Sequence, residues 1–130
     1  MLVLDENVPA AQRQLLREWR IRFRTVGVDT AVSGTEDENL IPILHRLSGP
    51  TFFSLDRDFY RPGLAHASYC LVWLNVRGRE AASFIRRFMR HPLFNTQAKR
   101  VGSVVRVHPA GVQYRRSSAR RWQSAEWPKL

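Results

Sequence analysis

Phe52-Phe53-Ser54-Leu55-Asp56-Arg57-Asp58-Phe59-Tyr60 is the stretch around which we expect this chain of 130 residues to fold. Its apolar beginning indicates a short buried strand. The strand runs directly into two carboxylates, Asp56 and Asp58, and an aromatic pair follows them. We expect other strands of the chain to bring further carboxylates to the point where this strand ends.

The segments on either side alternate between the patterns of strands and helices. Apolar or alternating runs predict strands at residues 1–4, 21–26, 51–55 and 68–75. Helical spacing and end signals predict helices at residues 9–19, 35–47 and 77–91, and a closing hairpin is expected at 101–107 and 112–115. This alternation indicates an α/β fold, with a central, mainly parallel sheet flanked by helices. We expect one domain, residues 1–115, followed by a basic tail of uncertain order, residues 116–130.

The charge of the chain is strongly positive but its acids are clustered. There are 21 Lys and Arg against 11 Asp and Glu, a net charge of +10. Such a balance favours nucleic acid or an acidic protein as a partner. Seven of the 11 acids nevertheless lie in three short groups: Asp5-Glu6, Glu36-Asp37-Glu38, and Asp56 with Asp58.

Other features of the composition bear on where the protein works. No apolar run approaches the ~20 residues that a membrane helix needs, and the beginning of the chain has no pattern of a signal peptide. The one cysteine, Cys70, lies in an apolar run and is expected to be a buried thiol. We therefore expect a cytoplasmic protein without a membrane partner.

Two of the acidic groups directly follow predicted strands. Asp5 comes after the first strand and Asp56 after the third, while Asp37 and Glu38 open a helix that also follows a strand and a loop. The carboxyl ends of parallel strands meet at one edge of the sheet, where ligands of α/β folds bind. Carboxylates that converge there repel one another unless a cation lies between them. Oxygen ligands suit Mg²⁺ or Mn²⁺, and such ions promote attack on phosphodiesters.

Each group also has a purely structural explanation. Asn7 can cap the helix that begins near Pro9, and Thr35 with Glu38 has the pattern of a capping box. Asp56 and Asp58 can form a turn with a local ion pair. The coincidence of three acidic groups in so basic a chain favours the metal site over three independent caps.

Other chemistries lack their residue patterns. The four histidines are far apart, and a single cysteine excludes a cysteine-based zinc site. No glycine-rich phosphate loop is present. Receiver and phosphatase domains also bind Mg²⁺ through acids at strand ends. A receiver, however, needs a lysine after a late strand, and a phosphatase needs its paired acids after the first strand.

Three motifs resemble those of the bacterial PIN-like domains, which are related to the VapC-type toxin ribonucleases. They are Leu4-Asp5-Glu6-Asn7-Val8-Pro9, Asp37-Glu38-Asn39-Leu40-Ile41 and Ser54-Leu55-Asp56-Arg57-Asp58-Phe59, in that order. The resemblance covers about residues 1 to 107. It implies a three-layer PIN fold and an acidic Mg²⁺ or Mn²⁺ site that hydrolyses RNA. It further implies a role as the toxin of a toxin–antitoxin pair, with a helix-turn-helix antitoxin as partner.

The resemblance also implies roles for single residues. Asp5, Asp37, Asp56 and Asp58 match the metal-binding and catalytic acids, and Glu38 is a further ligand beside Asp37. Glu6 and Asn7 complete the first motif and would orient the ligands. Ser54 departs from the family, in which a threonine is usual at this position.

Arginines supply candidate contacts to the RNA backbone. Those expected to bind nucleic acid are Arg79, Arg86, Arg87 and Arg90 on the predicted helix 77–91, and Arg120 and Arg121 in the tail. The alternative is a solvated helix face and a solubilising tail. The corresponding alternative function is a non-catalytic nucleic-acid- or partner-binding module with a degenerate PIN-like site. The sequence leaves open whether the protein forms a homodimer.

Overall fold

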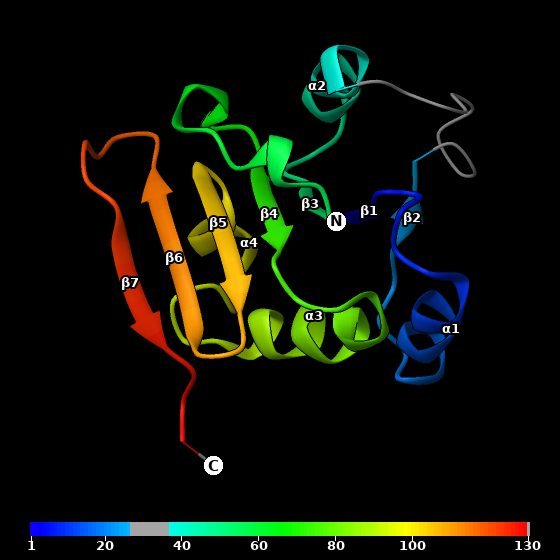
Figure 1. Ribbon diagram of the computed structural model, residues 1–130. Helices are drawn as coiled ribbons and strands as arrows, with labels where there is room; N and C mark the ends of the chain where they lie inside the picture. Colours follow the sequence, from blue (N-terminus) through cyan, green and yellow to red (C-terminus); the bar gives the residue numbers. More distant parts are fainter. Residues whose placement is uncertain (27–36, 130) are drawn as a thin grey trace.

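A seven-stranded mixed sheet forms the centre of the protein (Figure 1). The structure is a computed structural model, and it describes residues 1–26 and 37–129, with the side chains of residues 37–39 excluded. The strand order is β2-β1-β3-β4-β5-β6-β7. The first five strands in this order, from β2 to β5, run parallel to one another. Strand β6 is antiparallel to β5, and β7 is antiparallel to β6. The strands are β1 (Leu2–Leu4), β2 (Arg24–Thr25), β3 (Thr51–Ser54), β4 (Cys70–Leu74), β5 (Ser103–His108), β6 (Gly111–Arg116) and β7 (Gln123–Glu126).

Helices cover both faces of this sheet, so the predicted α/β fold with a central, mainly parallel sheet flanked by helices is confirmed. On one face, helices α1 (Ala10–Glu18) and α3 (Ala81–Arg90) bury Leu16 and Ile85 against strand residues such as Val72. On the other face, α2 (Asp37–Arg46) buries Leu40 and Leu44 in a second core. Figure 1 shows α1 and α3 together on one side of the sheet and α2 on the other. A short helix, α4 (Gln97–Arg100), precedes β5.

Three 3-10 turns connect these elements: η1 (Arg57–Phe59), η2 (Pro62–Leu64) and η3 (Gly78–Glu80). Turns η1 and η2 lie between β3 and β4. Phe59 of η1 is buried in the core under α2, with its ring centroid 4.9 Å from that of Phe52. The segment that carries the carboxylates of the central stretch is therefore anchored in the core by an aromatic side chain.

Three local predictions need correction. The predicted strand 21–26 is reduced to the two residues of β2. Asn7 does not cap α1, because Pro9 occupies the N-cap position and makes no side-chain cap bond. The segment after residue 115, expected to be a tail of uncertain order outside the domain, adds a strand to the sheet, because β7 pairs with β6 from Gly111↔Glu126 to Tyr114↔Gln123. The capping box expected at Thr35, together with Glu36, lies outside the described residues.

The tail is also held by side chains. Trp127 donates a hydrogen bond from Nε1 to the backbone oxygen of His108, at 2.9 Å. A ring nitrogen of the buried His91 lies 3.0 Å from the backbone oxygen of Glu126. Cys70 is fully buried, as expected. In the described part of the chain, no helix is long and apolar enough to cross a membrane.

Candidate functional site

Strands β1 and β3 place Asp5 and Ser54 side by side. The two strands are parallel with Leu4 opposite Phe53, and the backbone N–H of Asp5 donates to the oxygen of Phe53 at 2.9 Å. The next pair along the register is therefore Asp5 and Ser54. Asp56 follows two residues after Ser54, so Asp5 and Asp56 lie at the same end of two neighbouring strands.

The buried hydroxyl of Ser54 links these groups. It donates to Asp5 Oδ2 at 2.7 Å and accepts from the backbone N–H of Asp56 at 2.9 Å. It also accepts from Asn7 Nδ2 at 3.0 Å, while Asn7 Oδ1 accepts from the backbone N–H of Leu55 at 3.2 Å. Asn7 thus holds the loop after β1 against the loop after β3. The helix cap expected of Asn7 is replaced by this role, which fixes the distance between the two acidic segments.

The environment of Asp5 disfavours its charge. Burial raises the pKa of the Asp5 carboxyl, and the negative charge of Asp56 adds a smaller effect in the same direction. Hydrogen bonds from Ser54 and from the backbone N–H groups of Glu6 and Asn7 oppose this rise in the pKa. A cation bound between Asp5 and Asp56 would relieve both unfavourable effects.

Asp56 and Asp58 have different surroundings, although the sequence places them together. Asp56 caps η1, and its Oδ1 accepts from the backbone N–H of Asp58 at 2.9 Å. Asp58 lies 3.7 Å from Arg61, and both side chains are more than 60% exposed, at 61% and 63%. The structure therefore places Asp56 beside Asp5 and gives Asp58 an exposed ion pair.

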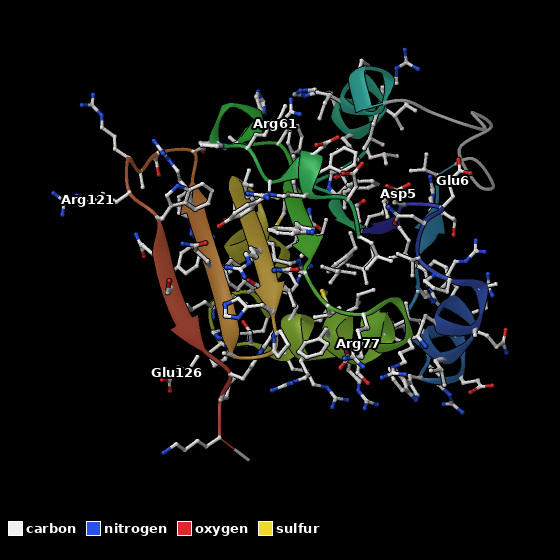
Figure 2. The ribbon with its side chains drawn as sticks, in the orientation of Figure 1. Asp5, Glu6, Arg61, Arg77, Arg121 and Glu126 are labelled. Carbon is white, nitrogen blue, oxygen red and sulfur yellow. The ribbon has the colours of Figure 1, made fainter. Side chains whose placement is uncertain are left out.

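The remaining acids of the predicted site are placed only in part. Glu6 is exposed next to Asp5, as Figure 2 shows. Asp37 and Glu38 form the beginning of α2, but their side chains lie outside the described residues. Helix α2 packs on the same face of the sheet as the side chain of Ser54, which is the face that a ligand at Asp37 would have to reach.

The donor chemistry suits a hard cation. Among the side chains that the structure describes, no group of three or more His, Cys, Asp and Glu is arranged to hold a metal ion. Mg²⁺, however, is usually held by only one or two carboxylates, with waters and substrate phosphates completing its shell. Asp5 and Asp56 provide such a pair of carboxylates. The residues present therefore fit Mg²⁺ or Mn²⁺.

The predicted arginines divide into separate groups. Arg79 is exposed in η3, next to Gly78, where an added Cβ would lie 3.3 Å from Pro9 and 3.8 Å from Leu55. Turn η3 thus approaches Pro9, before α1, and Leu55, after β3. Arg86 is partly buried, with its guanidinium carbon 3.8 Å from the ring centroid of Trp19.

Other predicted arginines lie away from the carboxylates. Arg86, Arg87 and Arg90 line a pocket of about 340 Å³ with Trp127 on the outside of α3. Arg120 and Arg121 are exposed before β7, and Figure 2 shows Arg121 on the opposite side of the molecule from Asp5.

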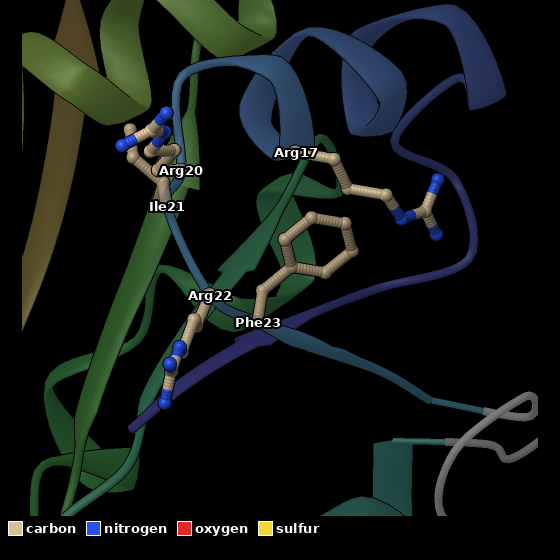
Figure 3. Close-up of a pocket in the computed structure, with 5 residues that line it drawn as sticks. All are labelled: Arg17, Arg20, Ile21, Arg22 and Phe23. Carbon is tan, nitrogen blue, oxygen red and sulfur yellow. The ribbon is translucent and has the colours of Figure 1, made fainter.

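A larger basic pocket lies at the other end of the parallel strands. Its volume is about 640 Å³, and it forms where α1 ends and the chain enters β2 (Figure 3). The residues that line it are Arg17, Arg20, Ile21, Arg22 and Phe23. Because β2 runs parallel to β1, this pocket is at the amino-terminal end of the strands, whereas Asp5 is at the carboxyl end. The pocket is therefore separate from the acidic site.

Some residues of the site region were not singled out by the sequence patterns. Trp73 is paired with Ser54 in the register of β3 and β4, and Arg106 is paired with Trp73 in the register of β4 and β5. Each lies near the carboxyl end of a strand that is mostly buried. The sequence signal for Trp73 and Arg106 was an amphipathic or charged side chain near the end of a strand. Their alignment with Ser54 becomes apparent only from the register of the sheet.

Comparisons of this chain with protein-family models, with curated proteins and with solved structures found no match.

Proposed function

We propose that this protein is a metal-dependent ribonuclease of the PIN-like type, which hydrolyses RNA phosphodiester bonds at the Asp5–Asp56 site. The observation that carries the proposal is the position of Asp5 and Asp56 just beyond the ends of adjacent parallel strands, where the Ser54 hydroxyl joins the Asp5 carboxylate to the backbone N–H of Asp56. A chain of net charge +10 has little reason to hold two acids together unless a cation joins them. The positive charge of the rest of the protein attracts a polyanionic substrate.

The residues have separate roles in this proposal. Asp5 and Asp56 bind Mg²⁺ or Mn²⁺, which supplies charge stabilisation at the phosphate and a lowered pKa of water. Ser54 holds Asp5 in position and favours its ionised form, and Asn7 keeps the two acidic loops together. Asp37 and Glu38 are the remaining ligands that the PIN-like resemblance implies. Arg79, in the turn that approaches Leu55, contacts the RNA backbone in this proposal.

The toxin role follows from the same resemblance. In this proposal the protein acts on cellular RNA in the cytoplasm, and a helix-turn-helix antitoxin binds and inhibits it. A gene for such a protein next to this one would support the toxin role.

Cleavage of an unstructured RNA provides the test. The wild-type protein is expected to degrade it with Mn²⁺ or Mg²⁺ and to be inactive with a chelator. Asp5→Asn and Asp56→Asn are expected to abolish cleavage and to weaken Mn²⁺ binding measured by calorimetry. Glu18→Gln is the matched control, because it removes an exposed carboxylate at the end of α1.

A second candidate function is a nucleic-acid- or partner-binding module without catalysis. It is favoured by the ion pair of Asp58 with Arg61, because Asp58 is one of the predicted metal ligands and its carboxylate is already paired with a cation. This candidate is supported if the wild type, Asp5→Asn and Asp56→Asn bind RNA equally and none cleaves it. That result would exclude the ribonuclease.

A further inference from the structure

A row of paired residues extends from the acidic site across the sheet. The register places Ser54 opposite Trp73, Trp73 opposite Arg106, and Arg106 opposite Gln113. Residues paired in this way point to the same face of a sheet. Since Ser54 binds Asp5, the row begins at the carboxylates and spans three strand spacings, about 14 Å.

Aromatic rings lie over this row. The ring of Tyr60 is 5.4 Å from that of Trp73 and 4.7 Å from that of Trp122, and its hydroxyl donates to Gln113 Oε1 at 2.7 Å. Burial raises the pKa of Tyr60 to about 12, so this donor stays protonated at neutral pH. The three rings come from the residue after η1, from β4 and from the segment before β7, and all three are only partly buried. Together they form a line of partly accessible aromatic surface.

Arginines flank the same rings. The guanidinium carbons of Arg57 and Arg106 lie 5.8 and 5.6 Å from the Trp73 centroid, and that of Arg115 lies 6.0 Å from the Trp122 centroid. The Asn75 amide, oriented with its oxygen toward Arg106, accepts from Nη2 at 2.9 Å and Nε at 3.0 Å. Arg106 is thus fixed in position. Within the described residues, none of the three arginines forms an ion pair with a carboxylate.

The aromatic–arginine row is defined here as Arg57, Tyr60, Trp73, Arg106, Arg115 and Trp122. We propose that the aromatic–arginine row binds single-stranded RNA and leads it into the Asp5–Asp56 site. Bases stack on the partly exposed rings, and the guanidinium groups contact the phosphates. The direction toward the carboxylates rests on the ribonuclease proposed above, but binding to the row does not.

The chemistry favours a single strand over a duplex or an acidic protein. Unpaired bases can stack on aromatic side chains, whereas the bases of a duplex are inaccessible to such a surface. An acidic protein segment would satisfy the arginines but would make little use of three aligned aromatic rings. Arginine beside an aromatic ring is a common arrangement in proteins that bind single strands without sequence preference.

Two matched pairs of variants test the row in the presence of a chelator, so that binding is measured without cleavage. Trp73→Leu is compared with Trp19→Leu, because both tryptophans are partly buried beside an arginine. Arg57→Gln is compared with Arg17→Gln, because both arginines are exposed beside an aromatic ring. Fluorescence anisotropy of labelled oligouridylate gives the dissociation constant. An RNA duplex of equal length is the second probe.

Trp73→Leu is expected to weaken binding of oligouridylate by about 5- to 150-fold, which corresponds to the loss of one stacked base. Arg57→Gln is expected to lower the slope of log affinity against log salt by about 0.7, because one phosphate contact is lost. The exposed Arg57 change leaves the core intact and tests the row even if Trp73→Leu fails to fold. Trp19→Leu and Arg17→Gln are expected to bind as the wild type does.

The outcomes separate this inference from the proposed function. Equal losses in the row variants and their controls would refute the row, as would tighter binding of the duplex than of oligouridylate. Failure to bind either RNA would also refute it and would favour an acidic protein as the occupant. Tight binding of oligouridylate that requires the row, without any cleavage when Mn²⁺ is added, would support the row and refute the ribonuclease.

Discussion

Removal of the Ser54 hydroxyl is expected to destabilise the protein by an amount that depends on pH. In Ser54→Ala, the charged carboxylate of Asp5 loses the hydrogen bond that it accepts from the hydroxyl, worth about 1.5–3 kcal/mol. The backbone N–H of Asp56 loses a neutral hydrogen bond, worth about 0.5–1.5 kcal/mol. The exposed amide of Asn7 can exchange its bond for water at little cost. The expected decrease in the free energy of unfolding is therefore about 2–4.5 kcal/mol near neutral pH.

The dependence on pH arises because the hydroxyl stabilises the ionised form of Asp5. In acid, at or below the ordinary pKa of an aspartate (~4), more than half of Asp5 is protonated, since burial raises its pKa. The bond from Ser54 is then a neutral one, and its loss costs about 1 kcal/mol less. The effect of Ser54→Ala should thus be larger near neutral pH than in acid. The pKa of Asp5 in the variant should rise above its wild-type value.

Urea denaturation at the two pH values measures this effect, and NMR titration of the Asp5 carboxyl carbon measures the pKa. Ser103→Ala is the matched control, because Ser103 is also a buried strand serine whose hydroxyl bonds a charged group, Arg116. Its cost should not depend on the ionisation of Asp5. Ser54→Thr keeps the hydroxyl and should remain close to the wild type. The reasoning would be refuted by a cost below about 0.5 kcal/mol, the lower limit for one hydrogen bond. A cost of Ser54→Ala that is equal at both pH values would refute it as well.

Three further predictions concern stability. Because the pKa of Asp5 is raised in the folded state, the wild type loses stability as the pH rises from the unfolded-state pKa through the folded-state pKa. Asp5→Asn removes this charge and should raise the metal-free melting temperature at neutral pH. In acid, where Asp5 of the wild type is neutral as well, the variant should lose this advantage. A melting temperature that falls at neutral pH would contradict this. Gly111→Ala should cost at least ~1–3 kcal/mol, because the new Cβ would lie 2.2 Å from the backbone oxygen of Ala125. Amide exchange in β7 should accelerate in this variant but not in Gly63→Ala, where nothing lies within 4 Å of the new Cβ. Asp58→Asn should change the free energy of unfolding by less than about 1 kcal/mol in urea titrations, because its ion pair with Arg61 is exposed.

The sequence predicted the elements whose hydrophobic patterns are strong. Strands β1, β3 and β4 are apolar runs buried in the parallel sheet, and α3 buries Phe84, Ile85 and Phe88 at helical spacing. The neighbouring position of Asp5 and Asp56 was predictable too, because both follow buried strands of one parallel sheet.

The elements that the sequence did not predict are held mainly by polar contacts. Strand β7 has almost no apolar signal, since most of Gln123–Glu126 is exposed. Its pairing with β6 and the bond from Trp127 to His108 keep it in place. The role of Asn7 was also not predictable, because an asparagine at this sequence position suits both a helix cap and a bridge to the loop after β3. Only the strand register distinguishes these two roles.

The register also explains why the carboxylates and the aromatic–arginine row lie on one face. The core beneath α2 contains Phe52, Leu71 and Val104. On their strands, these residues lie two positions before Ser54, Trp73 and Arg106, respectively. Since side chains alternate between faces, these core residues and the site residues point the same way. The core residues and the residues of the candidate site thus lie one after the other along the strands, on the same face of the sheet. Any change that shifts a strand by one residue would remove its site residue from the face, so the stability of the core and the geometry of the site depend on the same register.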